Sequence, residues 1–558
     1  MKKDYSNLSK KELIKVIDKL QSRKKYGLIW EEEKAREKFE EEAENALPVL
    51  KEVKNKEIKV DTNEPTNILI EGDNYHALSV LNYTHQGKID VIYIDPPYNT
   101  GAKDWKYNNN YVDINDTYRH SKWLQMMSNR LRLAKRLLKD DGVLICTIDE
   151  NELNRLGLLL EEIFGNQEIH CITIVHNPRG VQGNNFSYTH EYAYFVFRKN
   201  QRVIGQRKIN EEDIYWSNLR NWGGESLRTD AKNCFYPIIV KNERVVGFGE
   251  VPDEKFHPRK QTITKDDISY VYPIDKKGIE RKWRYARQSV EEIKEYLRVE
   301  KTKTGYEVKI GKDYGTVKTV WQDSRYDANE YGTKIVHKLV PKAHFDFPKS
   351  VFNTYDCIAP ILYERKRAIV LDFFAGSGTT GHSTIILNKE DGGERTFILC
   401  TNNENNICTE VCYPRIKKVI TGHKDYPEIT RTDANLKYFK TSFVKKSINR
   451  DEMKIRITKE CTEMLCLREG IFEKKKQAED YRIYEQGGRV MAIYYALERD
   501  GVELLRKELD NIEGEKILYC FTLDPLGLDK NEFADWPDVK LEPIPQKILD
   551  IYEQIYEH

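Results

Sequence analysis

Two runs of alternating strand-like and helix-like segments restrict this chain to a small group of folds. In the first run, the strand-like segments are short and rich in apolar residues, at 67–70, 90–94, 143–149 and 191–197. In the second run they are 368–372 and 396–400, and each is followed by a helical pattern. Strands that alternate with helices are typical of a mostly parallel sheet with helices on both faces. The expected fold class is therefore α/β, with one doubly wound sheet.

The stretch between the two runs, 203–340, lacks this alternation and is rich in Trp, Tyr, Gly and basic residues. We therefore expect a sheet domain assembled from 61–202 and 341–444, with 203–340 inserted between its two pieces. The flanking regions are a charged, helical 1–60 and a C-terminal α/β domain, 445–558. A length of 558 residues agrees with several domains rather than one core.

The overall charge does not identify a partner. Lys and Arg total 91 against 90 Asp and Glu, and a near-zero sum leaves a local basic face for nucleic acid open. The sequence has no run of about 18 apolar residues, and its first residues are charged where a signal peptide is apolar. The ten Cys form no CxxC pair. We expect a cytoplasmic protein with reduced cysteines and no metal site.

A proline-containing motif, Asp95-Pro96-Pro97-Tyr98, directly follows the strand-like segment 90–94. The carboxyl ends of parallel strands are where α/β folds place ligands. Two successive prolines fix the backbone and remove two amide donors, which leaves a rigid carbonyl beside the Asp95 carboxylate. That acceptor pair suits a planar NH2 group, and the Tyr98 ring offers a face on which a base can stack. The structural alternative is a strand that ends at proline with a capping aspartate.

A glycine-rich motif lies where segment 368–372 turns into a helix, and it reads DFFAGSGTT from Asp372 to Thr380. Glycines at such a turn let a cofactor approach the backbone closely. The third glycine of a dinucleotide site and the lysine of a phosphate loop are both absent. The motif therefore favours a cofactor without a pyrophosphate, although a turn of this kind is about as often purely structural.

Together the two motifs resemble the amino-methylating DNA methyltransferases that use S-adenosylmethionine. The proline motif precedes the glycine motif by about 280 residues, which resembles the circularly permuted β class. Other strings resemble the modification subunits of type III restriction systems: YGLIWE (26–31), IEGDN (70–74), DPPYNTG (95–101), HEY (190–192), FPKS (347–350) and NKEDGG (388–393). The resemblance covers about residues 20 to 440, and CTNNEN (400–405) departs from the family's more acidic segment.

This resemblance implies a Rossmann-like methyltransferase sheet and a role for each motif residue. The catalytic residues would be those of the proline motif, Asp95, Pro96, Pro97 and Tyr98. Asp95 and the Pro96 carbonyl would accept the hydrogens of the target amino group. Tyr98 would stack on a base flipped out of the duplex. The cofactor would contact Asp73, Pro348, Lys349, Ser350, Asp372, Phe374, Gly376, Gly378, Thr379, Thr380 and Glu404.

Within the cofactor set, the resemblance implies that Asp73 receives the adenine amino group and that Glu404 binds the ribose hydroxyls. The segment 348–350 would contact the cofactor carboxylate. Phe374 and the two glycines would shape the pocket, with Asp372, or Thr379 and Thr380, near the methionine end.

The candidate DNA contacts lie in two regions of the chain. The segment 276–287, KKGIERKWRYAR, mixes six basic residues with aromatic ones, which suits phosphate contacts and base stacking. Such a run is often only a solvated face, but β-class enzymes carry their target-recognition region here. The loop before segment 191–197 could line the pocket of a flipped base. The expected DNA-binding residues are Asn99, Asn177, Arg179, Phe186, Arg281, Lys282, Trp283 and Arg284.

The expected function is site-specific methylation of the N6 amino group of adenine in double-stranded DNA. The alternatives are an N4-cytosine DNA methyltransferase and a catalytically inactive, methyltransferase-like DNA-binding protein. The type III resemblance also implies a homodimer and a separate restriction subunit with helicase and nuclease activities. For 445–558, a dimerisation element, a docking surface and a fused nuclease stay open.

Overall fold

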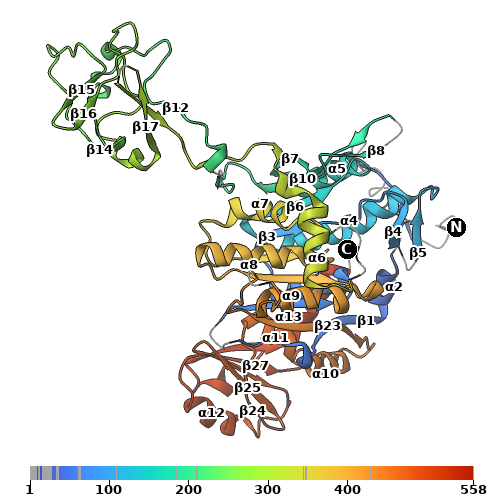
Figure 1. Ribbon diagram of the computed structural model, residues 1–558. Coiled ribbons are helices and arrows are strands. Elements are labelled where there is room, and N and C mark those ends of the chain that lie inside the picture. Colours follow the sequence, from blue (N-terminus) through green and yellow to red (C-terminus); the bar gives the residue numbers. More distant parts are fainter. Residues whose placement is uncertain are drawn as a thin grey trace. The chain divides into compact units, whose positions relative to one another are not determined.

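The protein is described from a computed structural model that places residues 9–10, 13–14, 28–32, 35, 37–60, 64–107, 110–182, 185–208, 211–303, 305–343, 345, 348–426 and 429–556. The chain forms two compact units, drawn in Figure 1. The first combines Met1–Gly205 with Lys318–His558, and the second is Gln206–Val317. Tyr26, Gly27 and Phe347, which belong to the strings above, lie outside the described residues.

A ten-stranded mixed sheet forms the centre of the first unit, in the order β1-β23-β2-β22-β21-β3-β6-β10-β7-β20. Its strands are β1 (Ala46–Glu52), β2 (Thr66–Glu71), β3 (Ile89–Ile94), β6 (Leu138–Ile148), β7 (Gln167–Val175), β10 (His190–Arg198), β20 (Val320–Gln322), β21 (Ile369–Asp372), β22 (Thr396–Thr401) and β23 (Asn435–Lys445). From β23 to β6 all neighbours are parallel, whereas β6, β10 and β7 pair antiparallel. The expected α/β sheet is therefore confirmed, and both runs of the sequence contribute to it.

The helices of the first unit form two contacting groups. One is α3 (Asn74–Thr84), α4 (Arg119–Leu137), α5 (Leu153–Phe164), α11 (Thr462–Glu469) and α13 (Gln546–Tyr556). The other is α6 (Lys334–Leu339), α7 (Val351–Leu362), α8 (Thr379–Asp391) and α9 (Tyr413–Thr421), which continues a π-helical turn, Ile407–Cys412. Helix α4 buries Trp123, Met127, Leu131 and Ala134, which recur every three or four residues and therefore share one face of the helix. Among the described residues, no helix is long and apolar enough to cross a membrane.

The C-terminal part of the first unit carries its own five-stranded sheet, which Figure 1 draws in red-brown beside α12 (Val502–Asp510). Its strands are β24 (Lys474–Gln477), β25 (Tyr481–Gln486), β26 (Arg489–Tyr494), β27 (Glu515–Phe521) and β28 (Val539–Ile544). Strands β25 and β26 form a hairpin and pair antiparallel around Gly487 and Gly488. The chain reaches this sheet through α10 (Arg450–Glu460).

The described residues of the second unit, green in Figure 1, form three small sheets. The first has β13 (Ile238–Lys241), β14 (Arg244–Phe248), β15 (Thr262–Lys265) and β16 (Ile268–Val271); the second has β12 (Ser217–Asn218), β17 (Leu297–Thr302) and β18 (Gly305–Ile310); the third pairs β11 (Gln206–Lys208) with β19 (Tyr314–Thr316). These strands are short or, like β17, mostly exposed, so they lack the apolar run that marks a buried strand in the sequence. The unit also spans fewer residues than the expected insert, 203–340. Residues after Val317 belong to the first unit, because β20 joins β7 in the large sheet and α6 contacts α9.

The remaining described elements are short: α2 (Lys38–Asn45), β4 (Ala102–Tyr107), β5 (Asn110–Asp113), β8 (Val181–Gln182) and β9 (Ser187–Tyr188).

Candidate active site

The proline motif lies at the carboxyl end of β3, in the middle of the large sheet. Strand β3 is buried along its whole length and ends at Ile94, so the motif begins on a rigid base. The Thr147 hydroxyl on neighbouring β6 donates to Asp95 Oδ1 at 2.7 Å. The Trp123 indole N–H donates to the Pro97 carbonyl at 2.7 Å. The motif is therefore held from both sides, and about a quarter of the Asp95 side chain, 27%, stays exposed.

Next to this motif lies a cluster of charged side chains from distant parts of the chain. The Tyr98 hydroxyl donates to Glu191 Oε2 at 3.0 Å, and the Lys349 ammonium forms an ion pair with the same carboxylate. Lys349 Nζ also lies 3.3 Å from Asp95 Oδ1, and the Asn353 amide donates to Glu191 Oε1 at 2.8 Å. Glu191 is on β10, whereas Lys349 and Asn353 lie at the start of α7. The cluster thus brings together side chains from both pieces of the sheet domain, 61–202 and 341–444.

Sequence reasoning missed Glu191 as a site residue. The string HEY belongs to the resemblance, which attaches no role to its glutamate. The available signal was an acidic residue in the otherwise apolar segment 191–197, because a buried carboxylate needs partners. Thr147 and Asn353 were missed as well, and as ordinary polar residues in a strand and a helix they carried no comparable signal.

The glycine motif forms the turn between β21 and α8. Gly376 has φ +48° and Gly378 has φ +81°, backbone conformations that residues with a Cβ adopt only with strain. A Cβ on Gly376 would lie 3.3 Å from the Phe345 ring, and one on Gly378 would lie 3.1 Å from Cys412 Sγ. The turn is therefore a place where bare backbone is required, which fits a cofactor that approaches it closely.

Asp372 and Thr380 hold this turn together. Asp372 Oδ1 accepts the Phe374 N–H at 2.9 Å, and Oδ2 accepts the Thr380 hydroxyl at 2.5 Å. Burial raises the pKa of Asp372 to about 7, although these two donors act in the opposite direction. Thr379 is likewise engaged, since its hydroxyl accepts from the Arg415 guanidinium at 3.0 Å. These three side chains therefore shape the turn from inside, and the half-buried Phe374 lies at its surface.

Two further cofactor candidates lie just beyond neighbouring strand ends. Asp73 follows β2 and caps α3, with Oδ1 accepting the Tyr75 N–H at 2.8 Å and nearly half of its side chain exposed. Glu404 follows β22 and forms an ion pair with Lys106. Strands β2, β22, β21 and β3 are adjacent and parallel, so the expected residues after them share one edge of the sheet.

The segment 348–350 differs from its expected role. Lys349 points to Asp95 and Glu191, the side of the proline motif. Ser350 is 1% exposed; it caps α7 and donates to the Arg325 carbonyl at 2.6 Å. Pro348 is buried beside them. The side chains of Lys349 and Ser350 are thus already bound within the protein, which argues against both as ligands of a cofactor carboxylate.

Two expected DNA contacts are wrong because their side chains are buried. Trp283 is 1% exposed and donates its indole N–H to the Tyr236 carbonyl at 2.8 Å, in the core of the second unit. Asn99 is fully buried, has φ +58° and donates to Glu152 at 2.5 Å. The sequence predicts an exposed strip of basic and aromatic residues at 276–287, but Trp283 faces inward.

The other basic-run residues are split between internal and surface roles. Arg281 binds Asp275 at 2.9 Å and the Ser226 hydroxyl at 2.7 Å, while Lys282 is partly exposed and Arg284 is exposed. Among the exposed aromatic rings of this unit is that of Trp222, which is 51% exposed, with the Arg220 guanidinium 4.8 Å from its ring centre; Tyr215 is 85% exposed.

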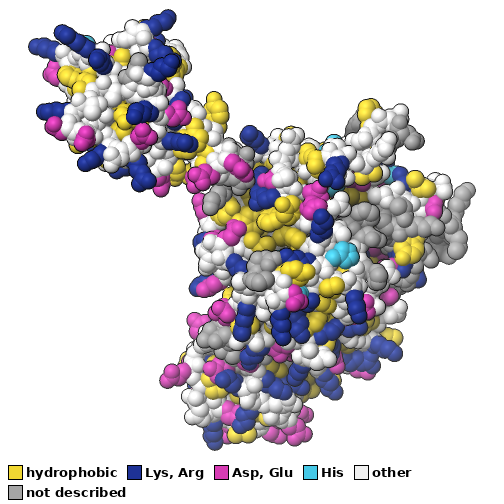
Figure 2. Space-filling model, in the orientation of Figure 1, with side chains coloured by type: hydrophobic (Ala, Val, Ile, Leu, Met, Phe, Trp, Pro, Cys, Tyr) yellow, Lys and Arg dark blue, Asp and Glu magenta, His cyan; other side chains and the backbone are white. Residues whose placement is uncertain are grey.

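The charges of the second unit are mixed rather than uniformly basic. Residues 206–317 include 23 basic and 19 acidic residues. Figure 2 shows Lys and Arg spread over the visible face of this unit with Asp and Glu among them. In the first unit, the loop between β7 and β10 presents an exposed Arg179 and a 78% exposed Phe186, with Asn177 half-buried.

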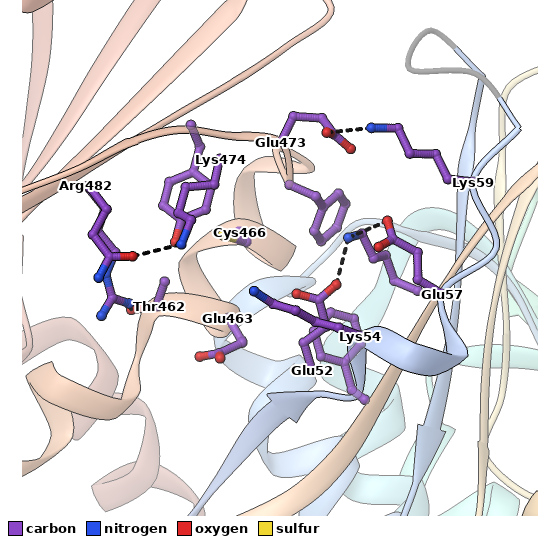
Figure 3. Close-up of a pocket in the computed structure, with 15 residues that line it drawn as sticks. Glu52, Lys54, Glu57, Lys59, Thr462, Glu463, Cys466, Glu473, Lys474 and Arg482 are labelled. Atoms are coloured by element: carbon purple, nitrogen blue, oxygen red, sulfur yellow. Dashed lines mark hydrogen bonds and ion pairs between the residues drawn. The ribbon is translucent and has the colours of Figure 1, made fainter.

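A cavity of about 400 Å³ lies elsewhere in the first unit, between β23, α11 and β25 (Figure 3). Its charged side chains largely neutralise one another. Lys437 pairs with Glu52 at 2.6 Å and Glu57 at 2.7 Å, and Lys59 pairs with Glu473 at 2.6 Å. We assign no chemistry to this cavity. In the part of the chain that the structure describes, no cluster of three or more His, Cys, Asp or Glu side chains could hold a metal ion.

Known proteins match most of the first unit's sheet. The sequence profile of the family described as DNA methylase matches residues 89–411, more than half of the chain. The type II methyltransferase M.KpnI of Klebsiella pneumoniae is 31% identical over 361 residues, which is 61% of this chain and 82% of that protein. The Mod subunit of the type III restriction-modification enzyme EcoPI, from Escherichia phage P1, is 30% identical over 412 residues.

The EcoPI match spans 65% of this chain but only 61% of the Mod subunit. Among solved structures, the putative DNA modification methylase TTHA0409 of Thermus thermophilus, complexed with S-adenosyl-L-methionine, is 12% identical. It covers 67% of this chain and 99% of its own, with a TM-score of 0.31, which is too low to support any correspondence of residues. On the profile match, the chain belongs to the DNA methylase family, whose enzymes take their methyl group from S-adenosylmethionine.

Proposed function

We propose that this chain methylates the N6 amino group of adenine at a specific sequence in double-stranded DNA. One observation carries this proposal: the Asp95–Tyr98 motif and the Gly376–Gly378 turn lie at the ends of two adjacent parallel strands, β3 and β21. An acceptor for an amino group and a backbone turn for a cofactor are therefore neighbours at one edge of the sheet. The 30% identity to a type III Mod subunit favours adenine over cytosine.

On the target side, Asp95 accepts a hydrogen of the amino group. Both contacts found for its carboxylate within the described ranges of the chain fall on Oδ1, so Oδ2 is the oxygen left to face the base. Together with the rigid Pro96 carbonyl, it orients the lone pair of the nitrogen. Tyr98 supplies the ring on which a flipped base stacks. The nitrogen that gains a methyl group must also lose a proton, and Asp95 is the carboxylate placed to take it.

On the cofactor side, the Gly376–Gly378 turn with Phe374 supports the reacting end, and Asp372 and Thr380 keep its shape. When bound, S-adenosylmethionine supplies an electrophilic methyl group on a sulfonium. Asp73, with its half-exposed carboxylate, would receive the adenine amino group. Glu404 would bind the ribose hydroxyls once it leaves Lys106.

We further propose that the second unit reads the DNA sequence, with Lys282, Arg284 and the exposed Trp222 as its contacts. In the first unit, Arg179, Asn177 and Phe186 would contact the flipped nucleotide or its neighbours. We also propose a separate restriction subunit with helicase and nuclease activities, supported by the name of the EcoPI relative as a Mod subunit, and a homodimer, which rests on the resemblance to type III systems alone.

The test is transfer of a labelled methyl group to plasmid DNA, followed by digestion to nucleosides. N6-methyladenine is the expected product. N4-methylcytosine would move the enzyme to the alternative specificity. If S-adenosylhomocysteine binds but no label reaches the DNA, the chain is a DNA-binding protein without this activity and the proposal is wrong.

A further inference from the structure

Glu191 is a buried carboxylate that contacts the proline motif. Only 1% of it is exposed, and a charge taken out of water is strongly disfavoured unless donors and an opposite charge surround it. Glu191 has both, from Tyr98, Asn353 and Lys349. Burial raises the pKa of Glu191, but the charges of Lys349 and His176 and the hydrogen bonds from Lys349 and Tyr98 together outweigh burial and hold that pKa below its ordinary value. Glu191 is therefore an anion at neutral pH.

Lys349 links this anion to Asp95. Its ammonium lies 3.3 Å from Asp95 Oδ1 while paired with Glu191, and 14% of its side chain is exposed. Burial lowers the pKa of Lys349, but Asp95 and Glu191 together raise it, so the ammonium stays charged. The three side chains then sum to one negative charge. If Glu191 carried no charge, the same ammonium would neutralise Asp95 instead.

A negative charge at Asp95 matters for the proposed reaction, on which this inference rests. The amino nitrogen becomes positive as its bond to the methyl carbon forms and the bond between that carbon and the sulfonium sulfur breaks, before its proton passes to Asp95. A carboxylate already fixed beside that nitrogen stabilises the charge without reorganisation. We propose that Glu191 is a positioning residue for methyl transfer: it holds and compensates the Lys349 ammonium, so that Asp95 keeps its charge for the target amino group.

The same contacts assign Lys349 to the target side of the site rather than to the cofactor. Its ammonium is bound to Asp95, Glu191 and Tyr98, and the helix that follows it is tied to Glu191 through Asn353. Removal of the ammonium should therefore leave cofactor affinity unchanged. A lysine that held the cofactor carboxylate would behave in the opposite way.

The experiment compares Glu191→Gln, Lys349→Met and the double variant with the full-length wild type. The first readout is the single-turnover rate of methyl transfer to plasmid DNA, normalised to the sites that bind S-adenosylhomocysteine. The second is the Kd for S-adenosylhomocysteine by calorimetry. Normalisation removes any unfolded fraction, and in the double variant neutral side chains replace the buried pair, which is often tolerated. Glu52→Gln is the matched control, because Glu52 pairs with the largely buried Lys437 away from the site.

We expect Glu191→Gln to lower the normalised rate on the order of 100-fold, the size typical for loss of one preorganised electrostatic group. The Kd should stay within about twofold in every variant, because no cofactor contact is removed. The double variant should regain about tenfold over Glu191→Gln, since the uncompensated ammonium is gone. The control should match the wild type. A residue that only stabilised the fold would leave the normalised rate unchanged in Glu191→Gln.

Three results would overturn the inference: a wild-type rate in Glu191→Gln, a double variant no faster than the single one, or a Kd raised about tenfold or more by Lys349→Met, which would correspond to about 1.4 kcal/mol of lost cofactor binding. A wild type that binds S-adenosylhomocysteine but never labels DNA refutes the proposed function itself, and this inference with it.

Discussion

The edge of the large sheet and the second unit hold their charges in opposite ways. At the edge, Glu191, Lys349 and Asp372 are largely or fully buried, and the partners of the first two lie more than 90 residues away in the chain. In the second unit, Lys282 and Arg284 are at least partly exposed. Chemistry on a target group needs charges fixed before the reaction, whereas phosphate contacts need charges that meet an incoming strand.

This contrast also shows in the aromatic residues. Tyr98 is tied by its hydroxyl to Glu191 and keeps a defined ring position. In the second unit, Trp283 lies in the core, whereas the Trp222 side chain is exposed. Two tryptophans of one small unit therefore have separate roles, one in folding and one at the surface.

The largest expected effect lies at the sheet edge. Asp95→Ala should lower methyl transfer at least about 10³-fold, because it removes both the acceptor and the charge that the nitrogen needs. The Kd for S-adenosylhomocysteine should stay within about twofold, since Asp95 contacts the target side. Single-turnover kinetics and calorimetry measure the two quantities. If the Asp95→Ala variant stays active, the proposal that methyl transfer takes place at this edge of the sheet is wrong.

The two tryptophans of the second unit give the next test. Trp283→Ala should destabilise that unit by about 3–5 kcal/mol, the cost of emptying a core site of this size. Trp222→Ala should leave stability within about 0.5 kcal/mol, as surface changes do, and weaken DNA binding by about 1–3 kcal/mol if its ring stacks on a base. Denaturant unfolding and fluorescence anisotropy separate these outcomes. If both variants lower stability equally, the proposed assignment of Trp283 to folding and Trp222 to DNA binding is wrong.

At the cofactor turn, Gly376→Val should weaken S-adenosylhomocysteine binding about 10- to 100-fold, since a branched side chain at positive φ forces the turn to move. Gly392→Ala is the matched control. It also has positive φ, +67°, but a Cβ there meets nothing within 4 Å. The control should cost about 1 kcal/mol of stability and leave the affinity unchanged. Unaltered affinity in Gly376→Val would place the cofactor away from this turn.

The smallest effect concerns the salt dependence of DNA binding. Lys282→Ala with Arg284→Ala should lower the slope of log K against log salt by about two units, because each phosphate that is no longer neutralised lowers it by close to one. Arg281→Ala should change the slope little, because its guanidinium is bound to Asp275 and Ser226. Titrations at several salt concentrations measure the slope. A larger change for Arg281 than for the pair would reverse this assignment.

The sequence by itself was enough for the α/β class, for six of the ten strands of the large sheet (β2, β3, β6, β10, β21 and β22) and for the two motifs of the proposed site. These features are local: prolines fix the backbone after β3, glycines permit the turn after β21, and apolar segments mark buried strands. Their nearness could be expected as well, because parallel strands bring their carboxyl ends to one edge. The hairpin β25–β26 and the buried face of α4 follow from equally local patterns.

Only the tertiary structure decided which side chains complete the site. Glu191 meets Tyr98 and Lys349 across 93 and 158 residues, a contact that no periodicity or spacing encodes. The Lys349 side chain points toward Asp95 while it is paired with the Glu191 carboxylate. Trp283 is buried in the core formed by the strands of the second unit, which carry no clear pattern in the sequence. Lys282 and Arg284 beside it stay at the surface. Local chemistry determines where a motif can form, whereas burial and partnership depend on what the rest of the fold packs against it.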